Sequence, residues 1–207
     1  MDKNPFDLFA DEYEGWFSEN GNIFQSELLA LKQLVPIGKK GIEIGIGSGI
    51  FAEQLEIKFG IDPSDKMLDY ARRRNLNVDK GIAENLPYPD ECFDFTAFIT
   101  SLCFIGNPDK AINEAYRILR KDGEIIIAFI DKHSKLGHIL EKEKDKSKFY
   151  SSASFYSVSE IVRLLEEKNE FKVSEILQTL TDINNQLIEQ PMKGFGKGSF
   201  IAIKANK

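Results

Sequence analysis

Three glycines at alternate positions, Gly45, Gly47 and Gly49, are the residues of this chain best suited to meet a ligand. They follow a short apolar run from Gly41 that is broken only by Glu43, a pattern typical of a buried strand in a parallel sheet. Glycines spaced in this way indicate a tight turn with unusual backbone angles, or a ligand pressed against bare backbone. The backbone amides at the start of the next helix, together with its dipole, favour a negatively charged group at this point.

A carboxylate stands at the end of the next apolar run. Residues 57–61 predict a second strand, and Asp62 follows it directly, where it is suited to accept hydrogen bonds from a ribose diol. A dinucleotide is one ligand class that fits such an arrangement. Its pattern G-x-G-x-x-G fails here, however, because the last position counted from Gly45 is Ile50. The glycines alone are also compatible with a turn that binds nothing.

The composition restricts the class of protein. The chain has 207 residues, of which 42% are hydrophobic and 29% charged, and this predicts one well-packed globular domain over residues 1–207. A net charge of −6 argues against broad attraction to nucleic acid. No apolar run is long enough to cross a membrane, and the N-terminus lacks the apolar segment of a signal peptide, so we expect a cytoplasmic protein. Two cysteines and two histidines without metal-ligand spacing predict no metal site: Cys92, Cys103, His133 and His138.

Strands and helices alternate along most of the chain. Amphipathic segments predict helices, among them one from Asn22 to Val35, one that Asn107 caps and Gly123 ends, and one that opens with the capping box of Ser157 and Glu160. This order predicts a parallel sheet with helices on both faces, whose last two strands pair antiparallel. Apolar or β-branched runs predict strands at 41–45, 57–61, 78–82, 93–99, 124–130, 171–180 and 200–205.

Two charged segments have simple structural explanations. Arg72, Arg73 and Arg74 end the helix that follows Asp62, where they complement the helix dipole, although a phosphate site is the alternative. Lysines and acidic residues alternate over 131–149, which is typical of a solvated helix face.

Four segments together resemble one family. Residues 43–49 have the form E-x-G-x-G-x-G, and the second strand continues as GIDPSDKMLDYAR at 60–72. Further along stand AENLPYPDECFDF at 83–95 and NPDKAINEAYRILRKDGEIII at 107–127. These segments resemble the class I S-adenosylmethionine-dependent methyltransferases, in particular their ubiquinone/menaquinone-biosynthesis-like branch. The resemblance implies an α/β fold with a Rossmann-like, doubly wound sheet, mostly parallel with a C-terminal antiparallel strand.

The resemblance also implies S-adenosylmethionine as cofactor and gives roles to single residues. Gly45, Gly47 and Gly49 should approach its methionine part, Glu43 should organise their turn, and Asp62 should accept hydrogen bonds from the ribose hydroxyls. Two residues after the second strand would flank the adenosine: Pro63 and Ser64.

The adenine contact departs from the family pattern. Family members usually carry an Asp after the third strand that binds the adenine amine, and here Ile82 stands at that position. The resemblance leaves Ala83, Glu84 and Asn85 as adenine neighbours, with the backbone amide of Ala83 as the remaining contact.

The segment after the fourth strand should line the reaction centre, because ligands bind at the carboxyl ends of parallel strands. Family members often have histidines there, whereas this chain has Cys103 and Phe104, so no histidine base comes from this segment. We assign Thr100 to the cofactor, and Cys103 and Phe104 to the acceptor. Cys103 is either a reactive thiol or, more commonly, a small buried residue.

Methyl transfer from a sulfonium is an in-line displacement, so the protein must hold the acceptor atom about 3–3.5 Å from the methyl carbon and exclude water. A base is needed only for acceptors such as a phenol or an ammonium. His133, Tyr13 and Asp131 are the titratable candidates, and His133 is also compatible with an exposed loop. We expect transfer to a small-molecule N, O or C acceptor.

Several alternatives remain open at this point. A protein or RNA methyltransferase is one, a cofactor-binding regulatory protein without transfer activity is another, and a nucleotide-dependent oxidoreductase is a third. Methylation of DNA or RNA bases is disfavoured, because TSLC at 100–103 replaces the N-P-P-Y type of tetrad.

The N-terminal segment, residues 1–21, is rich in aromatic and acidic side chains. We expect it to form a lid over the cofactor and to bring Tyr13 and Trp16 to the acceptor pocket, because residues three apart share a helix face. The alternative is that these rings only pack the segment onto the domain. Residues 131–155 and 181–197 are expected to be variable segments on the acceptor side.

Overall fold

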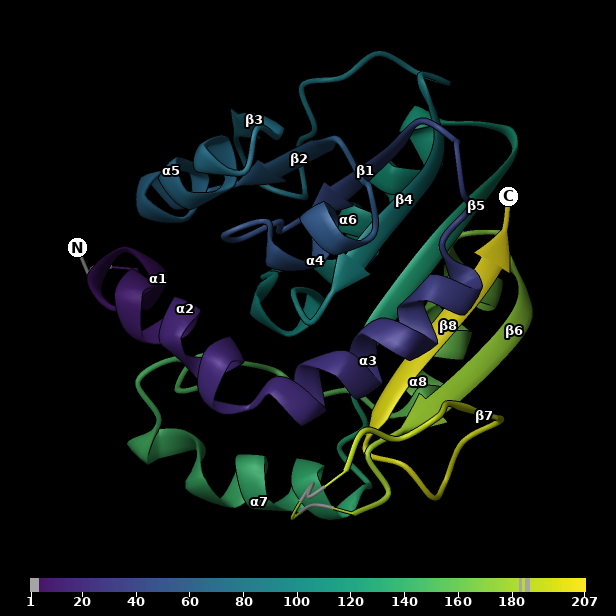
Figure 1. Ribbon diagram of the computed structural model, residues 1–207. Helices are drawn as coiled ribbons and strands as arrows, with labels where there is room; N and C mark the ends of the chain where they lie inside the picture. The colour runs from purple at the N-terminus through teal and green to yellow at the C-terminus, as the bar shows by residue number, and fades with distance from the viewer. Residues whose placement is uncertain (1–3, 183, 185–186) are drawn as a thin grey trace.

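A twisted sheet forms the centre of the computed structural model, which describes residues 4–182, 184 and 187–207 (Figure 1). Among these residues the sheet has eight strands in the order β3-β2-β1-β4-β5-β8-β6-β7. Strands β1 to β5 run parallel, while β8 pairs antiparallel with both β5 and β6. The strands are β1 (Gly41–Ile44), β2 (Phe59–Asp62), β3 (Asn77–Lys80), β4 (Phe93–Ile99), β5 (Leu119–Ile130), β6 (Lys172–Thr179), β7 (Met192–Lys193) and β8 (Phe200–Asn206).

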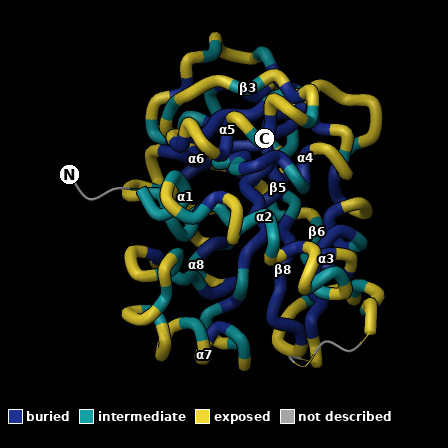
Figure 2. The backbone as a smooth tube through the Cα atoms, turned by 60° about the vertical axis from the view of Figure 1, so that its left-hand side comes forward, coloured by how far each residue is buried: buried dark blue, intermediate teal, exposed yellow. Residues whose placement is uncertain are grey.

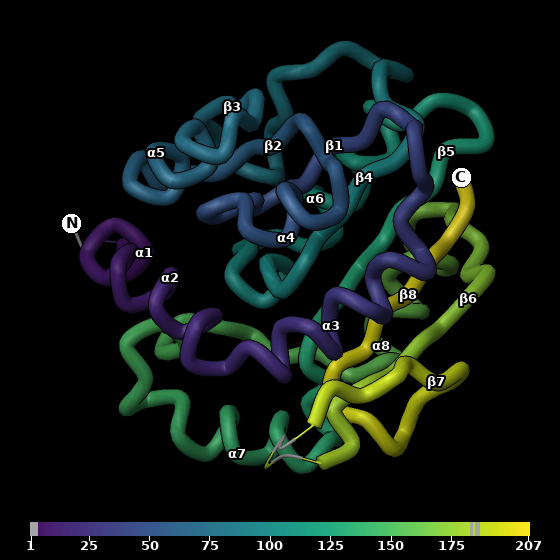
Figure 3. The backbone as a smooth tube through the Cα atoms, viewed as in Figure 1, coloured from purple at the N-terminus to yellow at the C-terminus, as the bar shows by residue number. Residues whose placement is uncertain are grey.

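Helices cover both faces of the sheet, which confirms the predicted doubly wound architecture. On one face α3 (Gly21–Leu34), α4 (Ile50–Gln54) and α5 (Asp65–Arg73) contribute their apolar sides to one buried cluster. On the other face α6 (Pro108–Ile118) and α8 (Val158–Arg163) contribute to a second cluster. In the tube view α3 runs beside β6 and β8 (Figure 3), and it contacts both strands.

Strand β5 contributes side chains to the buried clusters on both faces of the sheet. Ile125 and Ile127 pack on the side of α6, whereas Ile126 and Ala128 pack on the side of α3, because successive side chains of a strand point to opposite faces. All four are fully buried (Figure 2). A strand buried on both faces has no polar alternation, which is why the sequence EIIIAFI at 124–130 predicted it without ambiguity.

The predicted end of the helix before β5 was wrong. Gly123 does not end α6, which stops at Ile118, and β5 begins immediately at Leu119. The pairing with β4 shifts register at this point, so that the extra residues form a bulge in which Asp122 has a φ of 60°. A side chain at Gly123 would lie 2.8 Å from the carbonyl oxygen of Arg120, so glycine is required by the bulge.

The segments predicted at the acceptor side contain some regular structure. Residues 131–155 hold α7 (Lys135–Glu143) and a 3-10 turn at Lys144–Lys146. The range 181–197, predicted as loop, includes the short strand β7, whose Met192 pairs with Gln178 of β6. Residues 183, 185 and 186 of that range, and residues 1–3 of the N-terminal segment, lie outside the described residues.

The N-terminal segment forms α1 (Pro5–Leu8) and α2 (Ala10–Glu19). Figure 1 shows both helices on the side of the sheet where β1 and β4 end, with α1 beside α5 and α7 beyond them. Side chains from these helices therefore lie close to the glycine turn. No helix in the described part of the chain is long and apolar enough to span a bilayer.

Candidate functional site

The ends of β1 and β2 are tied together by the glycine turn. The backbone amides of Gly45 and Ile46 donate to the carbonyl oxygen of Ile61 at 2.8 and 3.1 Å. The amide of Gly47 donates to the Asp62 carboxylate at 2.9 Å. The turn is therefore held by the strand end that carries the acidic residue, and its shape depends on that residue.

The three glycines serve different purposes although all have positive φ. A Cβ on Gly45 would lie 2.5 Å from Cβ of Ser101, and one on Gly49 would lie 2.4 Å from a methyl group of Leu76. Both positions are glycine because of close packing. At Gly47 the nearest atom is the hydroxyl of Tyr13, at 3.8 Å. Gly47 is thus the position where the turn keeps free space.

The Asp62 carboxylate is almost completely buried and has a second backbone partner. Its Oδ1 accepts from the amide of Ser64 at 2.8 Å, and the Ser64 hydroxyl in turn donates to Asp7 at 2.6 Å. Burial raises the pKa of Asp62, the amides of Ser64 and Gly47 oppose this, and the charge of Asp7 adds to the rise. Each carboxylate oxygen accepts one backbone hydrogen bond and retains a further lone pair for a ligand.

Glu43 is a second acid beside the same turn. It is 2% exposed, and its Oε2 has no hydrogen-bond partner. Burial and then the charge of Asp62 raise its pKa well above the usual range, while the amide of Ala52 opposes the rise. Within the described part of the chain, neither Glu43 nor Asp62 pairs with a cationic side chain. A cationic ligand would favour the ionised form of both carboxyls.

Acidic residues attach the N-terminal segment to α5. Asp7 accepts from Ser64, Asp11 accepts from the hydroxyl of Tyr70, and Glu14 pairs with Arg74 at 2.6 Å. Asp11 and Glu14 are three residues apart and share a face of α2, whereas Asp7 lies on α1. Arg74 was predicted to complement the helix dipole. It also donates to the carbonyl oxygen of Ser48 in the glycine turn, at 3.0 Å.

Aromatic residues of the same segment meet rings from two other parts of the chain. Phe6 packs against Phe104 with ring centroids 5.0 Å apart, against Phe149 at 5.4 Å and against Tyr13 at 5.8 Å. The ring of Tyr150 stacks on Phe104 at 5.7 Å. We call Phe6, Tyr13, Phe104, Phe149 and Tyr150 the aromatic cluster. All five residues are partly exposed.

Tyr13 joins the aromatic cluster to the two buried acids. Burial raises the pKa of its hydroxyl, and the charges of Tyr150, Glu43 and Asp62 raise it further. The hydroxyl is therefore protonated at neutral pH and is able to donate a hydrogen bond. Trp16, predicted to share this position, instead packs on Phe17 with ring centroids 5.2 Å apart and is 39% exposed.

The predicted residues after β4 lie next to the aromatic cluster. Thr100 has a φ of 51°, and its amide donates to the carbonyl oxygen of Ala128 on β5. Burial raises the pKa of the Cys103 thiol to about 12, so the thiol is neutral at physiological pH. This agrees with the interpretation of Cys103 as a packing residue.

The predicted adenine neighbours follow β3 in a tight turn. Ala83 is buried, whereas Ile82 is 51% exposed. The Glu84 carboxylate accepts from the amide of Asn107 at 3.1 Å, which connects this turn to the start of α6. The amide of Asn85 is directed to the carbonyl oxygen of Ile82. Pro63, on the β2 side, is exposed.

The candidate base His133 lies on an exposed loop directly after β5. Its backbone amide donates to the carboxylate of Asp131 at 3.1 Å, which closes the turn into α7. Asp131 itself is 6% exposed. The exposed imidazole fits the simpler of the two interpretations, a loop histidine.

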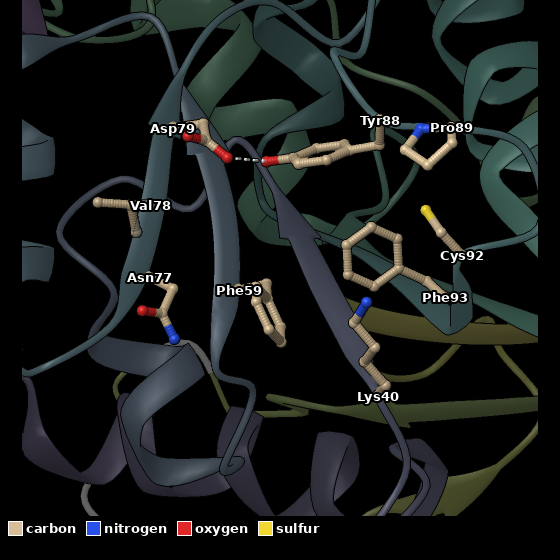
Figure 4. A pocket seen from close by; sticks show the side chains of 9 residues that line it. All are labelled: Lys40, Phe59, Asn77, Val78, Asp79, Tyr88, Pro89, Cys92 and Phe93. Atoms are coloured by element: carbon tan, nitrogen blue, oxygen red, sulfur yellow. Dashed lines mark hydrogen bonds between the residues drawn. The ribbon is translucent and has the colours of Figure 1, made fainter.

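A pocket of about 440 Å³ lies at the opposite edge of the sheet, where the strands begin (Figure 4). The ammonium of Lys40 lies there over the rings of Phe93 and Phe59, at 4.7 and 5.2 Å from their centroids. The hydroxyl of Tyr88 donates to Asp79 at 2.9 Å. Because none of the residues at the carboxyl ends of β1, β2 and β4 lines this pocket, we place the candidate site at the glycine turn. Among the described residues, no group of three or more potential ligands could hold a metal ion.

A doubly wound sheet with an antiparallel strand beside β5, a glycine turn after β1 and an acidic residue ending β2 defines a nucleoside-cofactor-binding protein of the methyltransferase type. Residues 42–127 match a family model described as a methyltransferase domain. A crystal structure from Thermotoga maritima, described as an S-adenosylmethionine-dependent methyltransferase and possible histamine N-methyltransferase, is 42% identical over 98% of both chains, with a TM-score of 0.94.

Two curated sequences extend this comparison. An uncharacterized protein of Methanocaldococcus jannaschii is 43% identical over 99% of both chains. A ubiquinone/menaquinone biosynthesis C-methyltransferase of Rickettsia akari is 30% identical over 54% of this chain and 43% of its own length. The chain therefore belongs to the class I S-adenosylmethionine-dependent methyltransferases and resembles their ubiquinone/menaquinone-biosynthesis branch. S-adenosylmethionine is its cofactor, and the sulfonium and ammonium of that molecule are cations that suit two buried, unpaired carboxyls.

Glu27 on α3 was not predicted as a site residue. It is 5% exposed and lies between the buried residues Ser26 and Leu28. Burial raises the pKa of its carboxyl to about 8. The sequence contained a weak signal, since an acid at this position interrupts the apolar side of the helix formed by Phe24, Leu28 and Leu31.

Gly47 and Gly49 provide a matched pair of variants. Alanine at either position adds the strain of a left-handed residue, about 1–2 kcal/mol. In Gly49→Ala the methyl group would also overlap Leu76, so we expect a further loss of about 1–3 kcal/mol in the free energy of unfolding. In Gly47→Ala the free energy of unfolding should fall only by the cost of the strain, while the affinity for S-adenosylhomocysteine also falls. Chemical denaturation measures the free energy of unfolding, and calorimetric titration measures the affinity. Equal effects of the two variants on both quantities would contradict this division of roles.

The raised pKa of Glu27 predicts a pH-dependent stability. An unfolded chain releases the Glu27 proton near pH 4.3, whereas the folded chain retains it up to about pH 8. The folded state binds more protons within this window, so stability falls as the pH rises through it and is constant above it. Glu27→Gln should therefore melt close to the wild type at about pH 5 and several degrees higher at about pH 8. Glu19→Gln, on exposed α2, is the control. A melting difference that does not vary with pH would show that Glu27 does not titrate in this range.

Proposed function

We propose that this methyltransferase transfers the methyl group of S-adenosylmethionine to a small molecule, held between the glycine turn and the aromatic cluster beneath the N-terminal segment. The observation that carries the proposal is the aromatic cluster itself. Its rings come from α1 and α2, from the segment after β4 and from the segment after α7, and they pack against one another. Rings from three segments would enclose an acceptor on several sides, which suits a small molecule better than a folded macromolecule.

The cofactor contacts follow from the buried acids. Asp62 has acceptor capacity for the ribose hydroxyls, and Glu43 has an unpaired oxygen for a cationic group of the methionine part. Gly47 leaves its backbone open to the ligand. We retain the remaining predicted contacts as part of this proposal: Gly45, Gly49, Pro63, Ser64, Ala83, Glu84 and Thr100.

The reaction mainly requires the protein to position the acceptor and to exclude water. The cofactor supplies an activated methyl group with a neutral leaving group. The aromatic cluster excludes water, and the Tyr13 hydroxyl donates a hydrogen bond that orients the bound groups. Because Tyr13 stays protonated at neutral pH, its contribution is orientation rather than proton removal. Cys103 and Phe104 border the acceptor in this arrangement.

The comparison with the protein from Thermotoga maritima supports a small acceptor. Histamine, which appears in the description of that relative, is a small amine. A protein or RNA substrate is the competing hypothesis. Three substrate pools separate the two: the ultrafiltrate, the protein and the RNA of a cell extract, each incubated with methyl-labelled cofactor. We expect label in the ultrafiltrate, and label in protein or RNA instead would overturn the proposal.

The ribose contact of Asp62 can be tested with a thermodynamic cycle. Asp62 also holds the glycine turn, so a variant alone would not separate the two roles. Asp62→Asn and the 2′-deoxy form of S-adenosylhomocysteine each remove one side of the contact. Loss of a charged hydrogen bond costs about 1.5–3 kcal/mol, so each change alone should weaken binding roughly tenfold or more. If the contact exists, the 2′-deoxy change should have little further effect in the variant. Independent, additive losses in calorimetry would assign the ribose to another residue.

The attachment of the N-terminal segment predicts how the lid opens. Asp7→Asn with Glu14→Gln weakens two partly buried polar contacts, together worth about 2 kcal/mol, or roughly 30-fold in the opening equilibrium. Proteolysis between α2 and α3 should accelerate accordingly, and S-adenosylhomocysteine should slow it. The control is Glu19→Gln with Glu167→Gln, which removes the same charge from exposed positions that do not attach the segment. Equal cleavage rates in the two double variants, with no effect of the ligand, would mean that the segment is not a lid.

A further inference from the structure

The pocket at the opposite edge of the sheet is lined by residues from four parts of the chain. Lys40 precedes β1, Phe59 begins β2 and Asp79 lies on β3. Tyr88 belongs to the loop before β4, and Phe93 is the first residue of that strand. The pocket volume of about 440 Å³ lies within the range of small-molecule sites, roughly 300–1,000 Å³. Methyl transfer does not account for this pocket, because the glycine turn lies at the carboxyl ends of the strands.

Three aromatic rings in edge-to-face contact give the pocket an apolar surface. The ring centroid of Phe93 lies 5.3 Å from that of Tyr88 and 5.8 Å from that of Phe59. Phe93 is 2% exposed, whereas Phe59 and Tyr88 are both partly exposed. A planar ligand could therefore pack on the two outer rings in the offset or edge-to-face geometry that aromatic groups prefer.

The loop that carries Tyr88 is held in place by hydrogen bonds. Arg117 of α6 donates to the carbonyl oxygen of Tyr88 at 2.8 Å and to that of Leu86 at 3.1 Å. The amide of Leu86 donates to Glu114 at 2.8 Å. On the other side, the hydroxyl of Tyr88 donates to Asp79 of β3 at 2.9 Å. The wall of the pocket is thus formed before any ligand binds, which reduces the entropy lost on binding.

The ammonium of Lys40 gives one end of the pocket a positive charge. Throughout the described residues, this ammonium takes part in no salt bridge and no side-chain hydrogen bond. The nearby acids have other partners, since Asp94 pairs with Arg120 at 2.6 Å and Asp79 accepts from Tyr88. Figure 4 shows Lys40 and Asp79 at opposite ends of the group of rings. An anion at the Lys40 end would therefore find a cation without a carboxylate partner.

We propose that this pocket binds a small aromatic acid, whose ring packs on Phe59 and Tyr88 and whose carboxylate pairs with Lys40. An uncharged ring would leave the ammonium unpaired, and an acid without a ring would leave the apolar surface uncovered. The two features together select an anion with a planar ring. The site is separate from the glycine turn, so the inference does not depend on which molecule accepts the methyl group.

Binding is measured by calorimetry with S-adenosylhomocysteine at saturation, which occupies the cofactor site. The probes are benzoate and 2-naphthoate, the alcohols of the same two skeletons as uncharged matches, and acetate as an acid without a ring. We expect at least one aromatic acid to bind roughly tenfold or more tightly than its alcohol and than acetate. Lys40→Gln should abolish the preference for the acid over its alcohol. Lys39→Gln, at the adjacent exposed position, should retain it.

A second variant tests the ring contact. Phe59→Leu keeps an apolar side chain but removes the ring, so it should weaken the aromatic acid and its alcohol by the same factor. An unchanged affinity for S-adenosylhomocysteine at the other edge verifies that each variant is folded. The inference is overturned if neither aromatic acid binds better than its alcohol to the wild type. It is also overturned if Lys40→Gln or Phe59→Leu leaves the affinity for the acid unchanged, because the acid would then bind elsewhere.

Discussion

The Asp62 carboxylate is the interaction on which the functional end of this protein depends. One oxygen holds the amide of Gly47 and the other holds the amide of Ser64, so the same side chain fixes the glycine turn and the start of α5. Through Ser64 it is connected to Asp7 and therefore to the N-terminal helices. A buried carboxylate that accepts several backbone hydrogen bonds is rigidly placed. The glycine turn, α5 and the N-terminal helices are therefore all connected through Asp62.

The N-terminal segment makes polar contacts with one set of side chains and apolar contacts with another. Acidic residues at positions 7, 11 and 14 bind α5, while Phe6 and Tyr13 turn toward the aromatic cluster. Arg74 binds Glu14, Glu53 and the carbonyl of Ser48, so it connects this segment to the glycine turn as well. The arrangement lets polar contacts, which are weak and reversible, position apolar rings that exclude water. Such an arrangement would suit the proposed lid.

Buried acids without cations recur at this end of the molecule. Glu43, Asp62 and Glu27 all have raised pKa values, and burial is the main cause in each case. In the unliganded protein they reduce stability at neutral pH, because the unfolded chain ionises them freely. A cationic cofactor would offset part of that cost on binding. Part of the folding free energy lost in the free protein would then be recovered as binding free energy for a cationic ligand.

The sequence by itself determined the doubly wound, mostly parallel sheet, and it predicted a cofactor site at the glycine turn. Apolar runs and glycine spacing are local signals, and strands such as 124–130, which are buried on both faces, cannot adopt another role without exposing that surface. The segments that resemble the methyltransferases identified the family before any contact was known. The roles of Gly45 and Gly49 were not readable, because Ser101 and Leu76 approach them from elsewhere in the chain. The end of α6 was also predicted wrongly, because it depends on the register shift between β4 and β5.

Only the tertiary structure decided which side chains form the aromatic cluster. Phe149 and Tyr150 lie more than a hundred residues from Phe6, and no local pattern relates them. Trp16 and Tyr13 share a helix, yet Trp16 is turned to Phe17 because the core ring of Phe17 lies between them in the packing. Glu27 looked like one polar residue on an amphipathic helix, and its burial depends on what packs against α3. Periodicity predicts which face is apolar, whereas the neighbour that covers each face is set by the three-dimensional path of the whole chain.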